Sequence, residues 1–251
     1  EETDSMEISL LTDVGQKRTN NQDYANLFVN RAGKTLIILA DGMGGHRAGN
    51  IASEMAVTDL GAAWVDTQID SVNQVREWFA ENLEEENQRI HQFGQDEEYK
   101  GMGTTLEALA IIDNQAIYAH IGDSRIGLIR GDEYRQLTND HSLVNALLKA
   151  GQITPEEAER HPQKNIITQS IGQKDEVQPD YGMITLEDGD YLLLNSDGLT
   201  NMISDSEICD IVTSDISLSE KTQTLIRFAN NAGGLDNITV ALVRFDKEDK
   251  A

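Results

Sequence analysis

An apolar run ends in an aspartate and a glycine-rich turn at residues 36–45, LIILADGMGG. A strand that is buried on both faces has such a run, and it does not normally hold an aspartate inside, so Asp41 is expected at the strand end. Asp197 follows a second apolar run in YLLLNSDGL, and Asp236 precedes a third in GGLDNITVALV. Three carboxylates at three strand ends predict one shared site, although Asp-Gly and Asp-Asn are also ordinary turn pairs.

These carboxylates, together with Asp123, have no cluster of Cys or His beside them. Oxygen ligands without imidazole or thiolate favour Mg²⁺ or Mn²⁺ over zinc. Carboxylates that converge without a cation would repel one another and raise each other's pKa. Two divalent ions about 3.5–4 Å apart would relieve this repulsion and could hold a hydroxide for in-line attack on phosphorus.

The segment GQKRTNNQD adds two candidates, Arg18 and Asp23. A guanidinium can bind a phosphoryl group through two parallel hydrogen bonds, which a lysine cannot do. His46 follows the glycines of DGMGGH and could donate a proton to a leaving oxygen. The alternatives are a solvent-exposed arginine and a loop histidine without a role.

The chain has 251 residues and carries 44 acidic against 20 basic side chains, a formal net charge of −24. This charge argues against nucleic acid and against an anionic membrane as partners. Cys209 is the single cysteine, so no internal disulfide can form, and its helical context favours a small buried apolar residue. No apolar run is long enough to span a membrane and no signal peptide is visible, so a cytoplasmic location is expected.

Strands and helices are predicted in groups rather than in strict alternation. Strand-like runs occupy 7–12, 25–29, 35–40, 104–112, 115–121, 125–130, 134–138, 181–185, 190–195 and 238–245. Helical periodicity occupies 50–65, 72–93, 204–212 and 218–232. Short turns between many of the strands favour antiparallel pairing, and the grouping predicts an α+β fold with antiparallel sheets inside and helices outside.

One domain over residues 6–246 is expected, because no repeat or Pro/Ser-rich linker divides the chain. Residues 1–5, EETDS, are interpreted as a remnant outside this domain. Residues 141–164 are predicted to form two short helices in a surface insertion, called the flap below, with Thr154 as N-cap and Pro155 at the first helical position of the second.

Six motifs in this order resemble those of the bacterial branch of the metal-dependent type 2C protein Ser/Thr phosphatases, the PPM family. They are RTNNQD, DGMGGH, GMGTTL, IGDSR, SDGL and DNITV, and the resemblance runs from about Met6 to Phe245. It implies a βα-sandwich of two central antiparallel sheets flanked by helices, with two Mn²⁺ or Mg²⁺ ions in a cleft at one end.

The resemblance also implies a role for each matching residue. Asp41 matches the carboxylate that bridges both ions, and Gly42 offers its carbonyl to one of them. Asp197 and Asp236 match ligands of the other ion, and Asp23 would act mostly through metal-bound water. The remaining matches are Asp123 for a third, weaker ion, Arg18 for substrate phosphate, His46 for the general acid, and residues 141–164 for a mobile flap.

Two positions depart from the family pattern. Gln22 stands where many members have Glu, so one ion would have one fewer anionic ligand and is expected to bind more weakly. Asn50 stands where bacterial relatives often have Glu, and it is expected to cap a helix that begins near Ile51. Neither change removes a core carboxylate, so an active enzyme is expected.

The leading hypothesis is a phosphatase that hydrolyses phosphoserine and phosphothreonine without a phosphoenzyme, by attack of a metal-activated water. The resemblance implies that it acts on phosphoproteins and opposes a bacterial Ser/Thr kinase. One alternative is a phosphoprotein-binding scaffold with the same fold but no turnover. A two-metal nuclease is a further alternative, against which the net charge counts. A monomer is the default, since nothing in the pattern demands an oligomer.

Overall fold

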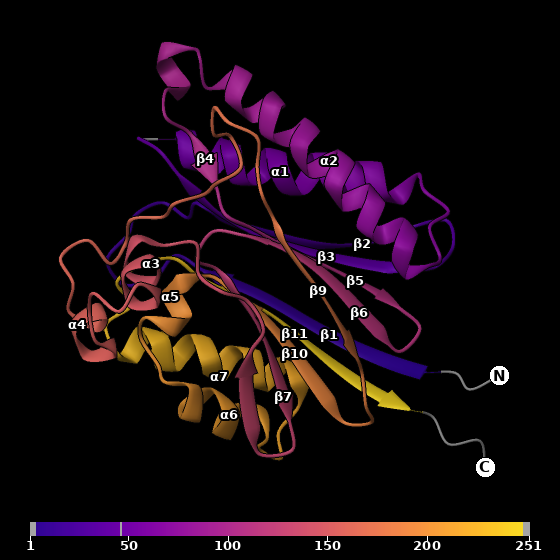
Figure 1. Ribbon diagram of the computed structural model, residues 1–251. Coiled ribbons are helices and arrows are strands. Elements are labelled where there is room, and N and C mark those ends of the chain that lie inside the picture. Colours follow the sequence, from indigo (N-terminus) through magenta and orange to yellow (C-terminus); the bar gives the residue numbers. More distant parts are fainter. Residues whose placement is uncertain (1–3, 46, 248–251) are drawn as a thin grey trace.

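The computed structural model describes residues 4–45 and 47–247, and two antiparallel sheets lie face to face at its centre (Figure 1). The first sheet has the strand order β1 (Asp4–Asp13), β11 (Ile238–Lys247), β10 (Asp190–Asn195), β7 (Arg125–Arg130) and β8 (Glu133–Gln136). The second has the order β2 (Asp23–Val29), β3 (Thr35–Met43), β5 (Leu106–Ile112), β6 (Gln115–Ile121) and β9 (Asp180–Thr185), with β4 (Gly103–Thr104) paired to the end of β3.

Helices cover the outer face of each sheet, which confirms the predicted layering (Figure 1). The second sheet is covered by α1 (Ala48–Val65) and α2 (Val72–Phe93), and a short helix η1 (Glu97–Tyr99) follows them. The first sheet is covered by α5 (Asp197–Thr200), α6 (Asp205–Val212) and α7 (Leu218–Asn231). No helix in the described ranges combines the length and the apolar character needed to cross a membrane.

The apolar run of β3 is continuous because both of its faces are buried. Leu36 and Ile38 belong to the core between this sheet and α1 and α2. Ile37 and Leu39 belong to the core between the two sheets. Alternate residues of a strand point to opposite faces, so a strand inside a four-layer sandwich needs apolar residues at every position. This burial fixes the strand end that carries Asp41.

Residues 4 and 5 extend β1 beyond the predicted start of the domain. Asp4 pairs with Lys247, and Ser5 pairs with Asp246. The described chain therefore enters the sheet before Met6. Residues 1–3 lie outside the described residues, so the interpretation of them as a remnant stays a prediction. The single domain over 6–246 also stays a prediction.

The start of α1 differs from the prediction. The helix begins at Ala48, with Arg47 at the N-cap position and no side-chain capping bond. Asn50 does not cap it, because its side-chain amide exchanges two hydrogen bonds with that of Asn20, both at 2.9 Å. The prediction of an Asn50 cap was wrong because a partner from a distant segment takes up the amide.

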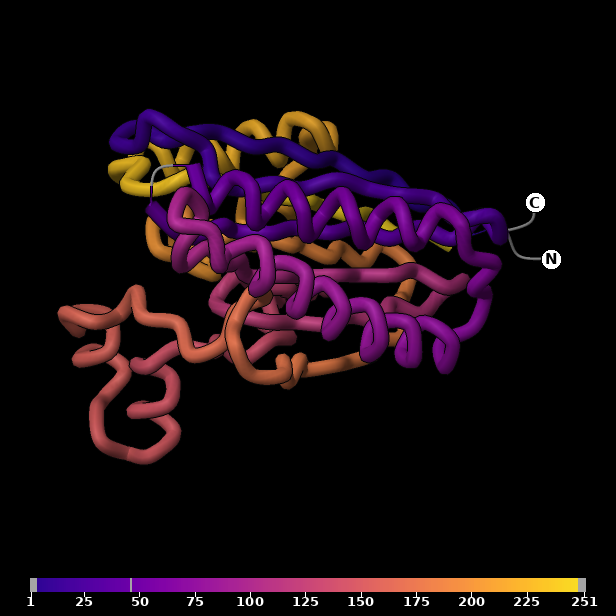
Figure 2. The backbone as a smooth tube through the Cα atoms, turned by 90° about the horizontal axis from the view of Figure 1, so that it is seen from above, coloured from indigo at the N-terminus to yellow at the C-terminus, as the bar shows by residue number. Residues whose placement is uncertain are grey.

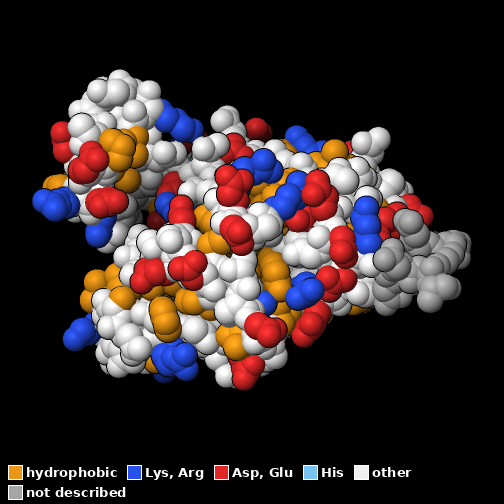
Figure 3. Space-filling view, turned by 90° about the horizontal axis from the view of Figure 1, so that it is seen from below, with side chains coloured by type: hydrophobic (Ala, Val, Ile, Leu, Met, Phe, Trp, Pro, Cys, Tyr) orange, Lys and Arg blue, Asp and Glu red, His pale blue; other side chains and the backbone are white. Residues whose placement is uncertain are grey.

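The flap protrudes from the sandwich, at one end of the sheets (Figure 2) and as a separate lobe in the space-filling view (Figure 3). Its helices are α3 (Leu143–Lys149) and α4 (Pro155–Glu159). The predicted cap is confirmed: Thr154 Oγ1 accepts a hydrogen bond from the Glu157 N–H at 3.2 Å, and Pro155 opens the helix. An isolated bridge between Ser142 and Ile167 closes the base of the flap.

We predict that Leu39→Ala lowers the free energy of unfolding by about 2–5 kcal/mol, because it leaves a cavity between the two sheets. Leu27→Ala on the neighbouring strand β2 is the control, since Leu27 is 39% exposed and its truncation should cost about 1 kcal/mol or less. Urea unfolding at neutral pH measures both. Equal losses would contradict the burial of β3 on both faces.

Candidate metal centre

Strands β2 and β3 bring the first two candidate carboxylates together, because Asp23 is the register partner of Asp41. Asp23 is buried, and its Oδ2 accepts hydrogen bonds from Ser196 Oγ at 2.8 Å and Thr239 Oγ1 at 2.7 Å. Its Oδ1 is also buried and has no hydrogen-bond partner in the described ranges. Burial raises the pKa of Asp23 to about 6, against the two hydroxyl groups that lower it.

Thr105, between β4 and β5, fixes the backbone of Asp41. Its N–H donates to the Asp41 carbonyl at 2.9 Å, and its Oγ1 accepts from the Asp41 N–H at 3.0 Å. Burial raises the pKa of Asp41 well above its usual range. The carboxylates of Asp23, Asp197 and Asp123 raise it further. Ionised carboxylates at this density favour a bound cation.

Asp197 and Asp123 come from the ends of two further strands, β10 and β6. Burial raises the pKa of both side chains, and the charge of Asp197 raises that of Asp123 further. A hydrogen bond with Asp41 partly offsets the rise for Asp197, whereas the charge of Asp236 adds to it. Asp197 Oδ1 is the second buried carboxylate oxygen of this group without a partner in the described ranges.

Asp236 and Arg18 form the more open side of the group. Arg18 Nε lies 3.4 Å from Asp236 Oδ1, and Arg18 Nη2 donates to Asp236 Oδ2 at 3.5 Å. The Arg18 side chain is 55% exposed, so a ligand can reach its guanidinium. Its charge also lowers the pKa of Asp197.

Asn237 holds the loops of the site together, and sequence reasoning missed it. Its Oδ1 accepts from the Gln22 N–H at 2.9 Å, and its Nδ2 donates to the carbonyls of Val14 at 2.9 Å and Asn20 at 3.0 Å. Its own N–H donates to Asp236 Oδ1 at 2.8 Å. Ser196 and Thr239, which hold Asp23, were missed in the same way. All three are polar residues that lie close in sequence to a candidate ligand at the end of an apolar run, and this position could have indicated their role.

Two glycines of the site lie against backbone where no side chain fits. A Cβ on Gly42 would lie 1.9 Å from the carbonyl oxygen of Gly49, and one on Gly198 would lie 1.9 Å from that of Asn237. The Gly42 N–H also donates to the Gln22 carbonyl at 2.9 Å. Glycine at these positions lets the carboxylate-bearing loops pack without displacement.

Two residues that the sequence singles out, His46 and Gln22, keep roles that are predictions. His46 lies outside the described residues, so its role as general acid stays a prediction. Gln22 points its Nε2 toward the Gly44 carbonyl at 3.4 Å, and its effect on metal affinity is also a prediction. The structure brings together the other candidates, which are Arg18, Asp23, Asp41, Gly42, Asp123, Asp197 and Asp236.

The donor set of this group fits divalent Mg²⁺ or Mn²⁺. It offers carboxylate and backbone carbonyl oxygens, two of the carboxylate oxygens are buried and unpartnered in the described ranges, and the pKa values are raised by burial and mutual repulsion. Hard cations of this kind prefer oxygen ligands. We therefore treat these residues as a candidate metal centre.

A tighter cluster of His120, His141 and Asp180 has ligand atoms within 4.8 Å of one another, but it is a hydrogen-bond network. His120 Nδ1 lies 2.6 Å from Glu107 Oε1, and its Nε2 lies 2.7 Å from the Asn139 carbonyl. Both ring nitrogens of His120 are occupied, so it has no lone pair for a metal. The cluster instead holds the base of the flap.

We predict that Gly42→Ala weakens Mn²⁺ binding by at least about tenfold, because its Cβ would displace the loop that follows Asp41 and small misplacements at a site are costly. Gly45→Ala is the matched control from the same turn, since a Cβ on Gly45 meets nothing within 4 Å. Isothermal titration with Mn²⁺ measures both. Equal affinities for the two variants would contradict the expected displacement.

We also predict a loss of stability above neutral pH that depends on His120. Burial by itself lowers the pKa of His120, but Glu107 and the Asn139 carbonyl raise it to about 9. Because the pKa of His120 is higher in the folded state than in the unfolded state, protonated His120 stabilises the fold. This stabilisation is complete below the unfolded-state pKa near 6.5, and it is lost as the pH rises through the folded-state pKa of about 9.

The free energy of unfolding should therefore fall between pH 7 and pH 10 by about 2 kcal/mol more in the wild type than in the double variant Glu107→Gln/His120→Gln, which also removes the buried carboxyl that is coupled to His120. Urea unfolding at both pH values measures the difference. His161→Gln in the flap is the control and should keep the wild-type slope. A double variant with the wild-type slope would exclude this source of pH dependence.

Comparison with known proteins places the chain in a family. The family described as protein phosphatase 2C matches residues 14–240. The chain is 84% identical over 244 residues to the protein phosphatase PhpP of Streptococcus pneumoniae serotype 2 (strain D39 / NCTC 7466), which covers 97% of this chain and 99% of that protein.

Two solved structures are similar over nearly the whole chain. The S. agalactiae serine/threonine phosphatase is 62% identical with a TM-score of 0.94, over 95% of this chain and 99% of that one. The catalytic domain of the phosphatase PstP, solved in complex with 2 manganese ions, is 32% identical with a TM-score of 0.85, over 97% of this chain and 100% of that one. The chain therefore belongs to the protein phosphatase 2C family.

Proposed function

We propose that this protein is a metal-dependent serine/threonine protein phosphatase that hydrolyses phosphoserine and phosphothreonine in other proteins. Relatives that are 84% and 62% identical are named as phosphatases, and they match nearly the whole chain. The observation that carries the proposal is the group of aspartates around Asp41, which come from separate strands or from the segments beside them and raise one another's pKa. The scaffold alternative has no observation in its favour.

The family resemblance implies which residues would hold Mn²⁺ or Mg²⁺. Asp41, the Gly42 carbonyl, Asp197 and Asp236 would hold the two ions. Asp23, held by two hydroxyl groups, would act through water, and Asp123 would hold a third, weaker ion. When bound, the ions would activate a water for attack on phosphorus and would offset charge on the phosphoryl oxygens.

Arg18 would bind and orient the phosphoryl group of the substrate. Its contacts with Asp236 are long, at 3.4 and 3.5 Å, and its side chain is 55% exposed. The carboxylate therefore aims the guanidinium, while its N–H groups can still reach a phosphate through two parallel hydrogen bonds. Such an arginine contributes by positioning and by charge stabilisation, which dominate phosphoryl transfer.

A covalent phosphocysteine intermediate does not fit the structure. Cys209 is 7% exposed within α6, and burial raises the pKa of its thiol. A thiol that is buried and protonated is a poor nucleophile. Hydrolysis in one step by water is the mechanism that the site supports.

The partners follow from this activity. Phosphoserine and phosphothreonine proteins, including a cognate kinase and its substrates, are the proposed substrates. A cytoplasmic location, a monomeric state and the absence of nucleic-acid and membrane partners stay predictions.

We predict that the protein hydrolyses a phosphothreonine peptide in Mn²⁺ and that EDTA abolishes this activity. Asp236→Asn should lower kcat/KM by at least about a hundredfold, because it removes one anionic ligand and the partner of Arg18. Release of phosphate measures activity, and isothermal titration with Mn²⁺ gives a readout that does not depend on turnover.

Asp215→Asn is the matched control, because Asp215 is exposed in the turn before α7 and lies outside the site. It should retain wild-type activity and Mn²⁺ affinity. Full activity in EDTA would refute a metal-dependent phosphatase. Tight binding of the phosphopeptide in Mn²⁺ without release of phosphate would favour the scaffold.

A further inference from the structure

A cavity of about 600 Å³ lies at the base of the flap, outside the candidate metal centre. Its walls come from α2, β6, the start of β9, the segment before the flap, and α3. Its volume falls in the range of small-molecule binding sites. None of its lining residues is a candidate metal ligand.

Two cationic side chains from different elements line this cavity, Arg76 of α2 and Lys149 of α3. The guanidinium of Arg76 stacks on the ring of Tyr181, 3.2 Å from the ring centroid, which holds it in place. Within residues 4–45 and 47–247, neither cation forms an ion pair with a carboxylate. Both charges are available to a ligand.

The one carboxylate in the wall, Asp180, already has a partner. The Gly122 N–H donates to His141 Nδ1 at 3.1 Å, so the ring proton of a neutral His141 lies on Nε2. That Nε2 lies 2.9 Å from Asp180 Oδ2 and donates to it. In a chain of net charge −24, two unpaired cations against one partnered carboxylate form a local excess of positive charge.

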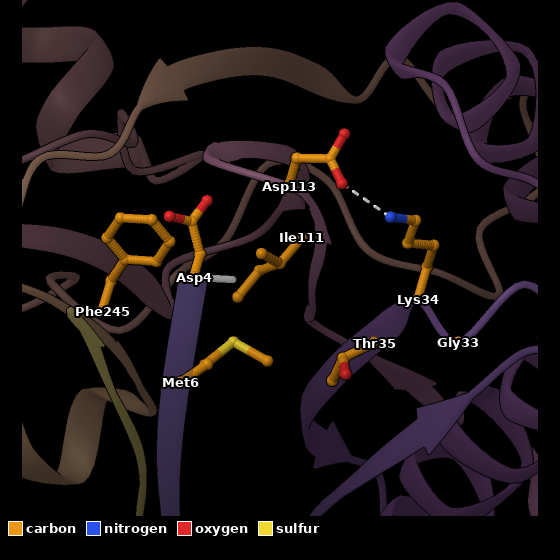
Figure 4. Close-up of a pocket in the computed structure, with 8 residues that line it drawn as sticks. All are labelled: Asp4, Met6, Gly33, Lys34, Thr35, Ile111, Asp113 and Phe245. Carbon is orange, nitrogen blue, oxygen red and sulfur yellow. Dashed lines mark hydrogen bonds and ion pairs between the residues drawn. The ribbon is translucent and has the colours of Figure 1, made fainter. Parts of the chain in front are cut away.

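A second cavity, of about 340 Å³, differs from the first in the charge of its wall (Figure 4). Among the described residues its one cationic side chain, Lys34, is paired with Asp113 at 2.8 Å, and Asp4 adds a further negative charge. Met6, Ile111 and Phe245 add apolar surface to its wall. The described residues of this second cavity offer no unpaired cation to an anion, whereas those of the cavity at the flap base do.

We propose that the cavity at the flap base binds a phosphoryl dianion, either free orthophosphate or a phosphorylated side chain of a polypeptide. Arg76 of α2 offers a planar fork of N–H donors, and Lys149 of α3 offers a second positive charge. Tyr181 and Asn139 also line the cavity and carry neutral polar groups. The choice of a phosphoryl ligand rests on the proposed function, which brings phosphorylated chains and released phosphate to this protein.

The test compares the Mn²⁺-loaded wild type with Arg76→Gln, Lys149→Gln and the double variant. One arm uses peptides that carry a phosphothreonine as the substrate group and, two to ten residues away, a second test position. The test position holds a non-hydrolysable phosphonate side chain in one peptide and threonine in the reference peptide. At one spacing, the phosphonate peptide should have a KM about tenfold lower than the threonine peptide in the wild type, with the same kcat. In the double variant the KM difference between the two peptides should be less than about twofold. The other arm counts bound orthophosphate by equilibrium dialysis.

Arg160→Gln in the flap is the matched control, because it removes a positive charge that does not line the cavity. It should keep the wild-type KM difference and the wild-type phosphate count. Hydrolysis of p-nitrophenyl phosphate should be the same in all these proteins, which shows that the metal centre and the fold are intact.

A KM difference that the double variant loses supports the site and identifies a polypeptide as the source. One fewer bound orthophosphate in the double variant, without a KM difference, supports the site and identifies free phosphate. Variants that match the wild type in both arms overturn the proposal. Absence of p-nitrophenyl phosphate hydrolysis in the wild type would instead refute the proposed function.

Discussion

Repulsion among buried carboxylates is the constraint on which the structure of this site depends. Burial raises the pKa of Asp23, Asp41 and Asp197, and each nearby carboxylate adds to the cost of ionisation. Such a group stays together only on a scaffold whose other interactions outweigh the cost. Three apolar cores supply that scaffold, one between the sheets and one under each helical layer. The divalent cations proposed above would offset the remaining repulsion.

The strands could be predicted because their apolar runs report burial directly. Ile37 and Ile38 face different cores, and this double burial appears in the sequence as a run without polar interruption. The candidate ligands could be predicted because Asp at the end of such a run is unusual. The partners of those ligands could not, since Ser196 and Thr239 reach Asp23 from the other sheet across more than 170 residues. Contacts of this kind depend on register and on how the sheets stack, which local patterns do not contain.

Seven basic residues in the described ranges form ion pairs with particular carboxylates, among them two arginines of β7. Arg125 forms a bidentate pair with Asp140, at 3.0 and 2.8 Å, next to the loop of Asp123. Arg130 forms a second bidentate pair, with Asp190, at 2.9 and 2.7 Å. The first pair acts on the metal centre, where burial raises the pKa of Asp123, Asp140 raises it further and Arg125 lowers it. Arg76 and Lys149 of the flap-base cavity form no such pair in the described ranges.

The flap base and the metal centre are joined by a continuous set of contacts. His141 binds Gly122 twice, since its ring accepts from the Gly122 N–H at 3.1 Å and its own N–H donates to the Gly122 carbonyl at 2.8 Å. Gly122 has a φ of +107°, and a Cβ there would lie 2.6 Å from the side chain of Thr105, the residue that fixes the Asp41 backbone. Packing this close transmits displacement, because a dense interior has little free volume to absorb it. Through these contacts the start of the flap at His141, the loop before Asp123 and the backbone of Asp41 constrain one another's positions.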